Sequence, residues 1–501
     1  MEELSELERV RREKMQAIRE AGMPPFPHRT HRTHTTQQAI AAFEEAGEDE
    51  QIMVAIAGRL RSIRKMGKST FAHVEDEHGK LQIYLRLDEL DEDRMKLFNE
   101  YVDLGDFVQA EGTMMRTRSG EITLKIADFS MLAKAITPLP AIKEEVVDGE
   151  TVVHHAFRDP EARYRQRYVD LAVNEEVREI FRSRARIVTA IREFLDERGF
   201  LEVETPILQP IYGGAAARPF TTHHNQLHQD LYLRISFELY LKRLLVGGFE
   251  RVYEIGRDFR NEGVSYKHNP EFTQIEYYIA YADYNDVMEL TEQMVGFIAQ
   301  QTTGSSKIEY QGQRIDLSPP WKRIQLREAL MEFADVDIQD HPTVDSLRKL
   351  MLERGHEPRQ GSSRGQLIES LLVNYVEPKT IQPCFLYDYP RDISPLAKSK
   401  VGDPQTVERF EGFVAGFELC NAFTELNDPF DQEQRFLEMG RDYDVEDEEC
   451  HPMDEDYLQA LRYGLPPCGG FGMGVDRLVM LLTDQANIRE VILYPHLRSR
   501  E

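Results

Sequence analysis

The sequence predicts an α+β protein, with a small β-barrel near the N-terminus and a larger domain of helices and strands after it. Short apolar strands separated by glycines fill residues 52–134, a proline-bounded, charge-rich stretch follows, and helical patterns mix with strands beyond. The 501 residues suffice for roughly two to four domains. We expect an N-terminal helix and lead-in segment at 1–50, a barrel at 51–136, a linker at 137–160 and the larger domain at 161–501.

The leading segment is predicted to begin with an amphipathic helix over about residues 1–21. Apolar residues recur there at helical spacing among charges, and Gly22 with Pro24 ends the pattern. The barrel strands are expected at Met53–Leu60, Phe71–Val74, Leu81–Leu87, Phe107–Thr113 and Ile122–Ile126. Five short strands favour an oligonucleotide-binding (OB) barrel, with another small barrel or a half sandwich as the alternative.

The larger domain is predicted to open with a long helix over residues 180–195. Gly199 caps this helix, and Phe200–Thr205 alternates as a strand that runs into Pro206. Further elements are expected as a strand at Tyr232–Ile235, a helix at Phe237–Val246 and helices within 337–380. The last of these regions carries no chemistry that we can identify.

Composition narrows the class of protein. The chain is 41% hydrophobic and 30% charged, with no long apolar run and no basic-apolar leader. These features predict neither a membrane span nor a secretory signal, so the cytoplasm is the expected location. Four cysteines without a Cys-x-x-Cys pair make a disulfide framework or a structural zinc site unexpected.

The net charge of −27 argues against a generic nucleic-acid binder, because non-specific affinity depends on cations that neutralise phosphates. A specific binder stays open, since a local patch counts for more than the total charge. Such a patch falls within the predicted barrel, at Arg59, Arg61, Arg64, Lys65 and Lys68.

Two arginine-bearing segments are the strongest functional signal in the chain. One runs from Arg257 to Glu262, and the other is the glycine-rich Gly470–Arg477. A guanidinium binds phosphate or carboxylate in a bidentate fashion, and glycine lets the backbone approach a polyanion closely. Together the segments predict a nucleotide held from two sides. The alternative is that Arg260 and Arg477 form ordinary surface ion pairs with the neighbouring Glu262 and Asp476.

Several segments together resemble the bacterial-type class II lysyl-tRNA synthetases, over essentially the whole chain. The helix and strand ending at Pro206 resemble the first class II signature, Phe259–Glu262 the second and Gly472–Arg477 the third. Three further segments resemble the lysine-specific members: Gly213–Phe220, His223–Asn225 and Asn421–Asn427.

The resemblance implies both an architecture and an activity. It implies an antiparallel catalytic sheet flanked by helices, an N-terminal OB-fold anticodon-binding domain and a homodimer. The implied reaction is ATP-dependent ligation of L-lysine to tRNA(Lys) through lysyl-adenylate, with release of AMP and diphosphate and with Mg²⁺ as cofactor.

For ATP, the resemblance implies a role for both arginines. Arg260 would hold the α-phosphate and the lysine carboxylate, and Arg477 would hold the γ-phosphate. Also implied near ATP are Glu262, His268, Asn269, a stacking Phe272, and the magnesium ligands Glu411 and Glu418. The seven-residue spacing of those two glutamates would put both on one face of a helix, although not of a strand. A core aromatic and a solvated acidic face are the alternatives for Phe272 and the two glutamates.

For lysine, the resemblance implies a set of anions around the substrate. Glu276, Tyr278 and Glu425 match the positions around the ε-ammonium. Glu238 and the backbone of Gly214 match those at the α-amino group, with Asn421 and Arg260 at the carboxylate. The chemistry is reasonable, because a desolvated ammonium must be paired with an anion.

In the barrel, the resemblance places Phe71 where an aromatic ring stacks on an anticodon base. Arg59 and Gln82 match neighbouring contact positions, and Asp128 stands where the family usually has glutamate, so contact there is less secure. An ordinary core phenylalanine is the alternative for Phe71. Near the active site we expect Cys420 to be a small packing residue and not a nucleophile.

Other functions remain as alternatives. An aspartyl- or asparaginyl-type tRNA ligase would share the architecture, but an acidic substrate calls for cations where this chain has Glu276 and Glu425. A catalytically silent, synthetase-like RNA-binding protein would be expected to lack Arg260 or Arg477, and both are present.

Overall fold

The computed structural model of the chain describes residues 4–48, 50–140, 142–147, 150–155, 157–442 and 453–499. The chain divides into two compact units, Met1–Arg158 and Asp159–Glu501. Each unit has a hydrophobic core of its own, as expected of separate domains. Among the helices of the described residues, none is both long enough and apolar enough to cross a membrane.

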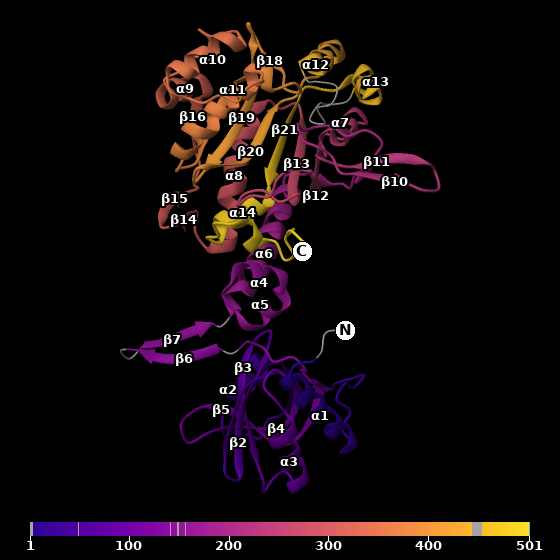
Figure 1. The fold of residues 1–501 in the computed structure, drawn as a ribbon, viewed down its shortest axis with the longest axis vertical. Coiled ribbons are helices and arrows are strands. Elements are labelled where there is room, and N and C mark those ends of the chain that lie inside the picture. The colour runs from indigo at the N-terminus through magenta and orange to yellow at the C-terminus, as the bar shows by residue number, and fades with distance from the viewer. Residues whose placement is uncertain are drawn as a thin grey trace. The chain divides into compact units, whose positions relative to one another are not determined.

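The first unit contains a closed five-stranded barrel in the order β1-β2-β3-β5-β4 (Figure 1). Its strands are β1 (Met53–Met66), β2 (Ser69–Asp76), β3 (Gly79–Arg86), β4 (Phe107–Arg116) and β5 (Ile122–Ala133). All five predicted strands are confirmed, and most are longer than expected. Alternate residues such as Val54, Ile56 and Leu60 are buried inside the barrel, which explains the alternating pattern.

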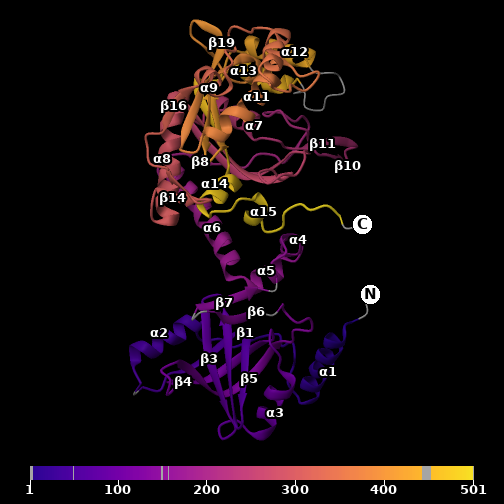
Figure 2. The ribbon, with the colours of Figure 1, turned by 60° about the vertical axis from the view of Figure 1, so that its left-hand side comes forward.

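Helices accompany the barrel in the described part of this unit (Figure 2). They are α1 (Glu6–Glu20), α2 (Thr36–Ala46) and α3 (Glu92–Tyr101). The predicted leading helix is confirmed as α1, which begins at a capping box formed by Ser5 and Glu8. Thr35 and Gln38 form the same motif at the start of α2.

The stretch expected to be a linker contains a hairpin. Strands β6 (Ile142–Val147) and β7 (Glu150–His155) pair antiparallel, with Ile142 opposite His155. The β-branched residues of β6 (Ile142, Val146 and Val147) and of β7 (Thr151–Val153) explain why this charged segment still forms strands.

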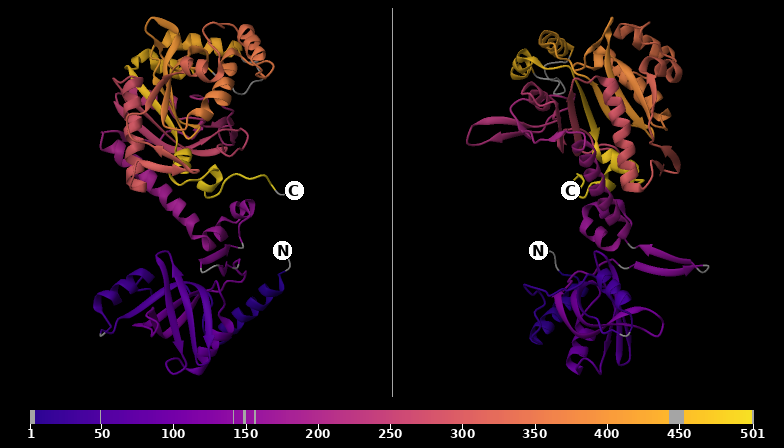
Figure 3. Two further views of the ribbon diagram at one scale, coloured as in Figure 1. Left: turned by 90° about the vertical axis from the view of Figure 1, so that its left-hand side faces the viewer. Right: turned by 180° about the vertical axis from the view of Figure 1, so that it is seen from behind.

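The second unit is built on a mainly antiparallel sheet in the order β16-β17-β19-β20-β21-β13-β12-β8, with β18 paired to β19 (Figures 1 and 3). The central strands are β19 (Asp403–Val414), β20 (Phe417–Thr424), β21 (Cys468–Gly474), β13 (Glu271–Ala280) and β12 (Arg251–Phe259). The outer ones are β16 (Lys322–Gln325), β17 (Cys384–Pro390), β18 (Ser399–Lys400) and β8 (Leu201–Glu202). Only the β16–β17 and β12–β8 pairs are parallel.

Helices α6 (Glu175–Asp196), α8 (Tyr284–Thr303) and α14 (Val475–Leu482) share one large core with one face of this sheet. On β13, Ile275 and Tyr277 belong to that core. The intervening residues of the same strand therefore point to the opposite face, because strand side chains alternate. That opposite face carries the candidate site.

Two sequence expectations for this unit need adjustment. The helix predicted over 180–195 extends over Glu175–Asp196, and the strand predicted at Phe200–Thr205 forms ladder pairs only at Leu201–Glu202. Beyond that point, Glu254 Oε2 accepts hydrogen bonds from the Thr205 amide (3.0 Å) and hydroxyl (2.7 Å). The Glu254 carboxylate thus takes the place of a strand carbonyl as the hydrogen-bond acceptor for the Thr205 amide. The region 337–380 is helical as predicted, with α10 (Val344–Glu353) and α11 (Arg364–Leu371) around a smaller core.

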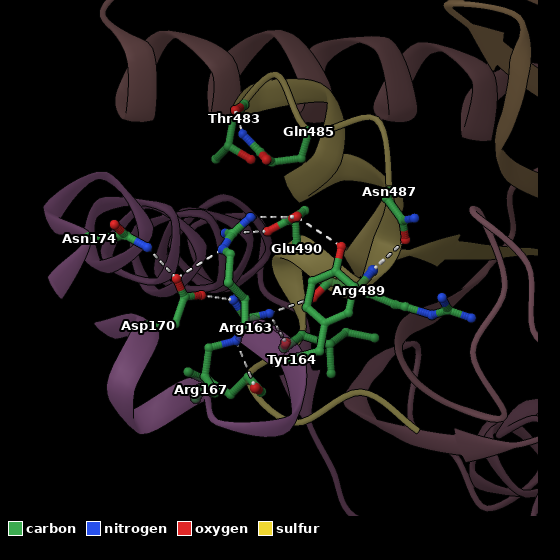
Figure 4. A network of polar contacts seen from close by, with 12 residues as sticks. Arg163, Tyr164, Arg167, Asp170, Asn174, Thr483, Gln485, Asn487, Arg489 and Glu490 are labelled. Atoms are coloured by element: carbon green, nitrogen blue, oxygen red, sulfur yellow. Dashed lines mark hydrogen bonds and ion pairs between the residues drawn. The ribbon is translucent and has the colours of Figure 1, made fainter. Parts of the chain in front are cut away.

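A network of polar contacts joins the start of the second unit to its C-terminal segment (Figure 4). Arg167, on α5 (Arg167–Val173), is fully buried and pairs with Asp170 at 2.5 Å. Its guanidinium also donates to the carbonyls of Arg489 (2.8 Å) and Leu493 (3.1 Å). Glu490, on α15 (Ile488–Val491), in turn accepts from Arg163 and from Tyr164 at 2.8 Å. The chain segment after α14 is thereby held against the segment before α6.

Candidate active site

A cavity of about 360 Å³ opens on the sheet face opposite α8. Its walls come from the middle of β13, β20 and β21, from the loop between β12 and β13, and from the glycine loop at 213–216. The predicted site residues that line it are Gly214, Glu238, Arg260, Glu262, His268, Asn269, Phe272, Glu276, Tyr278, Glu418, Asn421 and Arg477.

The alternation of strand side chains explains the floor of this cavity. On β21, Phe471 and Met473 pack into the core, whereas the glycines between them face the cavity. Gly472 is paired with Glu276 on β13 and with Asn421 on β20. Polar groups of two strands thus flank a strip that lacks side chains, which leaves room for a ligand.

Arg260 follows the end of β12, and its guanidinium lies over the Phe272 ring, 5.1 Å from the ring centre. Its Nε donates to the Ile235 carbonyl at 3.3 Å. A cation held against an aromatic face is pre-oriented and stays available to an anion. The structure therefore brings Arg260 and Phe272 together on one wall of the cavity.

Arg477 lies in the first turn of α14 and reaches two residues on other elements. Its Nη1 donates to Glu418 Oε2 at 3.1 Å, and its Nη2 lies 3.2 Å from His268 Nε2. Enclosure and the nearby Arg477 and Lys267 cations lower the pKa of His268 to about 4. A neutral His268 can accept a hydrogen bond from Arg477 at Nε2 while Nδ1, 2.8 Å from Ser265 Oγ, carries the ring proton.

The ordinary ion pair that the sequence left open for Arg477 is not formed. Asp476 is buried and pairs instead with Arg184 at 2.5 Å, and it also accepts the Thr273 amide at 2.8 Å. Asp476 therefore anchors α14 to the sheet. This leaves the Arg477 guanidinium to face the cavity.

The remaining residues expected near ATP also belong to the loop after β12. Glu262 is exposed, and its amide donates to the Arg260 carbonyl at 2.9 Å. Asn269 is buried, and its side chain bridges the Glu271 carbonyl (2.6 Å) and the His496 amide (3.2 Å). Asn269 therefore holds the loop in shape as well as lining the cavity.

Glu411 and Glu418 do not lie on one helix, which corrects that interpretation of their spacing. Glu411 is on β19 and Glu418 on the neighbouring β20. The Glu418 side chain is 39% exposed and lines the cavity. Glu411 is buried and already engaged, with Oε1 2.6 Å from Arg409 Nη2 and Oε2 2.9 Å from the Tyr389 hydroxyl.

The carboxylate set at this edge fits magnesium chemically. Carboxylate oxygens are the hard donors that this ion prefers, and magnesium usually takes one or two of them together with water and substrate phosphates. No group of three or more candidate metal ligands occurs within the described part of the chain. A substrate-dependent site at Glu418, with Glu411 next to it, is consistent with that donor count.

Gly214 and Glu238 lie against each other in the cavity wall. Gly214 has φ +90°, and a Cβ there would meet Ser236 Oγ at 2.8 Å and Glu238 Cβ at 2.9 Å. Only glycine therefore lets this loop close over the start of α7 (Glu238–Val246). Its backbone is exposed to the cavity as a result.

Glu276 is a buried carboxylate with several donors directed at it. Oε1 accepts from Ser236 Oγ (2.7 Å) and Gln274 Nε2 (2.8 Å), and Oε2 accepts from the Tyr278 hydroxyl (3.2 Å). Burial, together with neighbouring carboxylates, raises the pKa of Glu276 to about 8. Its position is fixed by hydrogen bonds, and a bound cation would favour its ionised form.

Glu425 is buried beside the cavity, next to Gly470 and the Tyr278 ring. The lining within the described residues includes Gly470 but not Glu425, which is fully buried. A Cβ on Gly470 would fall 1.9 Å from Glu425 Oε1, so this carboxylate lies directly against the wall. Its other oxygen forms an ion pair with Lys242.

Asn421 and Cys420 are adjacent residues on β20 with different roles. Asn421 lines the cavity, and its Oδ1 accepts from Arg409 Nε at 2.9 Å. Cys420 is 2% exposed and packs against Gly412, and burial raises the pKa of its thiol far above the usual value. The thiol stays protonated, which agrees with a packing role. Of the four cysteines, Cys450 lies outside the described residues.

In the barrel, Phe71 and Gln82 are close neighbours on the outer surface. Phe71 pairs with Tyr84 in the β2–β3 ladder, and their rings stack with centres 4.6 Å apart. Gln82 pairs with His73, two residues along. The partly exposed ring of Phe71 is therefore not a core residue.

The other two barrel candidates are engaged elsewhere on its surface. Arg59 lies over the Phe107 ring at 4.2 Å and donates to the Gly105 carbonyl at 3.0 Å. Asp128, on β5, pairs with Arg94 of α3 and is 60% exposed. Neither is brought against Phe71 by these contacts.

Sequence reasoning missed polar residues that hold the predicted ones in place. Gln274 shares the cavity face of β13 with Glu276, a spacing of two that strand alternation could have revealed. Lys242 lies four residues after Glu238 on one helix, the spacing of an acid–base pair. Arg409, which joins Asn421 and Glu411, has no comparable signal in the sequence.

Comparison with known proteins covers the full length of the chain. The family model described as tRNA synthetases class II (D, K and N) matches residues 159–498. A second model, described as OB-fold nucleic acid binding domain, matches residues 54–138.

Curated relatives that carry the name lysine–tRNA ligase align end to end with this chain. The protein of Pelotomaculum thermopropionicum is 51% identical, with 100% of this chain and 96% of the relative covered. That of Moorella thermoacetica is 50% identical, with 100% and 99% covered. That of Roseiflexus castenholzii is 51% identical, with both chains covered completely.

Proposed function

We propose that this chain, which belongs to the lysine–tRNA ligase family of class II tRNA synthetases, joins L-lysine to tRNA(Lys) at the cavity described above. ATP activates the amino acid as lysyl-adenylate, and the tRNA then accepts the lysyl group. The residue assignments rest on one observation, which is that cationic and anionic side chains line the same cavity. Arg260 and Arg477, which suit phosphates, and Glu238 and Glu276, buried carboxylates that suit an ammonium, line the same cavity.

In the first step, a lysine carboxylate oxygen attacks the α-phosphorus of ATP, and diphosphate leaves. Such a substitution is helped mainly by positioning and by cations near the developing charge. Arg260 would bridge the lysine carboxylate and the α-phosphate, with Phe272 supporting the adenine. Arg477 would hold the departing diphosphate, with its guanidinium positioned by Glu418 and His268.

Magnesium would be held by Glu418, with Glu411 beside it. When bound, the ion supplies positive charge to the phosphates of ATP. Glu411 would first have to turn from Arg409, so Glu418 is the principal ligand in this proposal.

Lysine would lie across the glycine strip of β21. Its α-amino group would meet Glu238 and the backbone of Gly214, and its ε-ammonium would meet Glu276 and Tyr278. Glu425 would act from its buried position beside Gly470 and Tyr278. This arrangement is unsuited to aspartate or asparagine, because a substrate carboxylate would face buried carboxylates instead of cations.

The direct test is lysine-dependent exchange between ATP and diphosphate, followed by charging of a tRNA(Lys) transcript. Exchange should require lysine and should not occur with aspartate or asparagine. A protein that binds tRNA without any exchange would favour the silent alternative, and exchange with aspartate would favour the acidic-substrate alternative.

Anticodon recognition would depend on Phe71 at the barrel surface. Replacing Phe71 with alanine should raise the KM for tRNA(Lys) by about 5- to 150-fold, because one stacked base contributes roughly 1–3 kcal/mol. Lysine-dependent exchange, which needs no tRNA, should stay unchanged. Phe26→Ala is the matched control, since Phe26 is an exposed ring of the same unit (51% exposed). Equal tRNA kinetics for both variants would rule out stacking by Phe71.

We further propose that the protein is a cytoplasmic homodimer. Exposed apolar side chains on and near β8, at Leu201, Ile207 and Leu208, support a second copy at that edge of the sheet. An enzyme acting on tRNA also fits the compartment where translation takes place.

A further inference from the structure

The most unusual charge in the second unit is an internal lysine. Lys242 on α7 is completely buried, with its Nζ 2.5 Å from Glu238 Oε1 and paired as well with Glu425. The rings of Phe423 and Tyr457 lie 5.5 Å and 6.0 Å from the same nitrogen. An ammonium group of the protein therefore lies between two of the carboxylates assigned above to a substrate that itself carries ammonium groups.

The charged and titratable groups around Lys242 come from all the elements packed against it. They are Glu238 on α7, Glu425 after β20, Tyr457 on α13 (Glu455–Gly464), Glu276 and Tyr278 on β13, Cys468 on β21, and, further out, Arg409 and Lys398. Burial acts to lower the pKa of Lys242, but the two carboxylates outweigh burial and raise the pKa well above its usual value. Lys242 is therefore charged at neutral pH.

The balance of charge between Lys242 and the carboxylates near it suggests what this lysine does. Three buried carboxylates surround the lysine end of the cavity, Glu238, Glu276 and Glu425, and Lys242 offsets one of their three charges. Two negative charges remain when all three carboxylates are ionised, the state that a bound cation favours. Free lysine carries two ammonium groups, and its own carboxylate is assigned to Arg260.

We propose that Lys242 is a positioning residue that acts as a built-in counter-ion and sets the unpaired negative charge of the cavity at two, which matches a diamino substrate. This inference rests on the lysine site proposed above. Lys242 touches no substrate in this arrangement and acts only through Glu238 and Glu425.

A buried carboxylate that has no cation beside it can instead be neutralised by binding a proton. A buried carboxylate without a cation keeps its proton, because burial disfavours the charged form. Glu276 already shows this tendency, since burial raises its pKa to about 8. Burial raises the pKa of Glu238 and of Glu425 even beside Lys242, which acts to lower both, so their pKa values would rise further without it. Release of a proton to pair with an ammonium would then be harder at neutral pH, and it becomes easier as the pH rises.

Lys242→Met keeps an unbranched side chain only one atom shorter and removes its charge. We expect the KM for lysine to rise about tenfold or more at pH 7, because each pKa unit above the working pH costs a factor of about ten in the ionised fraction. The ratio of variant to wild-type KM for lysine should fall towards one near pH 9, where the carboxylates lose their protons more easily. Titration of free lysine affects both proteins equally and therefore does not change this ratio. The KM for ATP should not change. A merely structural defect would raise both KM values and would give a ratio that does not depend on pH.

Arg243→Met is the matched control, because Arg243 is the next residue on α7 and pairs with Asp454 and Asp456 instead. It should leave the lysine KM ratio near one at every pH.

A second test does not need the single Lys242 variant to fold. Glu425→Gln leaves one unpaired negative charge in the cavity, whereas Glu425→Gln combined with Lys242→Met restores two. The double variant should therefore have a KM for lysine about tenfold lower than that of Glu425→Gln alone at pH 7. If the double variant is equal to or worse than Glu425→Gln, the charge-matching role is wrong.

The outcomes separate this inference from the proposed function. Absence of lysine-dependent exchange in the wild-type protein would overturn the function itself. Normal exchange in the wild type, combined with a lysine KM that neither rises nor varies with pH in Lys242→Met, would overturn only the role of Lys242.

Discussion

Arg260→Ala is expected to reduce lysine-dependent ATP–diphosphate exchange by about 10²- to 10³-fold, mainly in kcat. The reason is that a pre-oriented donor aimed at developing charge contributes at about this level. Arg260 is pre-oriented by Phe272 and by the Ile235 carbonyl, so its loss removes a charge that no side-chain rotation can replace. Steady-state exchange at saturating lysine and ATP measures the effect.

Arg257→Ala provides the control for Arg260. Arg257 lies on β12, the strand that Arg260 follows, and its Nε is 3.8 Å from an exposed Glu271 carboxylate. It lines no part of the cavity among the described residues. Exchange by Arg257→Ala should stay within about twofold of wild type. A comparable loss in both variants would point to damage of β12 and away from a phosphate contact.

Glu276→Gln should lower kcat/KM for lysine by about 10²- to 10⁴-fold. Removing one partner from a buried ion pair costs roughly 3–5 kcal/mol, and the amide keeps the shape of the side chain without its charge. The preference for lysine over methionine should fall by the same factor. Methionine has no ammonium group to pair with Glu276, so loss of the carboxylate charge lowers kcat/KM for lysine only. Exchange kinetics with each amino acid measure both numbers.

Glu271→Gln makes the same chemical change at the exposed end of β13, where the Glu271 side chain is 55% exposed. Kinetics with lysine should be unaffected there. Thermal unfolding of both variants would show whether Glu276→Gln is folded. A folded Glu276→Gln with unchanged lysine discrimination would remove Glu276 from the recognition site.

Much of the architecture could be predicted from local sequence patterns. The five barrel strands and α6 follow directly from alternation and helical spacing, because each buries one face of a regular element. The hairpin at 142–155 was harder to predict, since charges and prolines around it resemble a linker. The strand after Gly199 was overestimated because a Glu254 side chain, and not a strand, satisfies Thr205.

The site was predictable only as far as its signatures extend. Arg260, Arg477 and Glu276 could be assigned from the resemblance, and the structure brings them to one cavity. The partners that position them could not, because a contact such as Arg409 with Glu411 depends on strand register. The burial of Glu425 beside Gly470, outside the cavity lining, was also hidden, since no sequence pattern distinguishes a carboxylate that lines a cavity from one buried next to it.

The polar network around Arg167 has a topological consequence. Arg165, near the start of the second unit, donates through Nη2 to the Arg498 carbonyl at 2.6 Å, and Arg163 reaches Glu490 in the same region. The first and last segments of this unit therefore lie next to each other. A short peptide joining residue 498 to residue 161 should permit circular permutation, with new termini opened in a surface loop. The same closure would allow the barrel to be exchanged without opening the catalytic core.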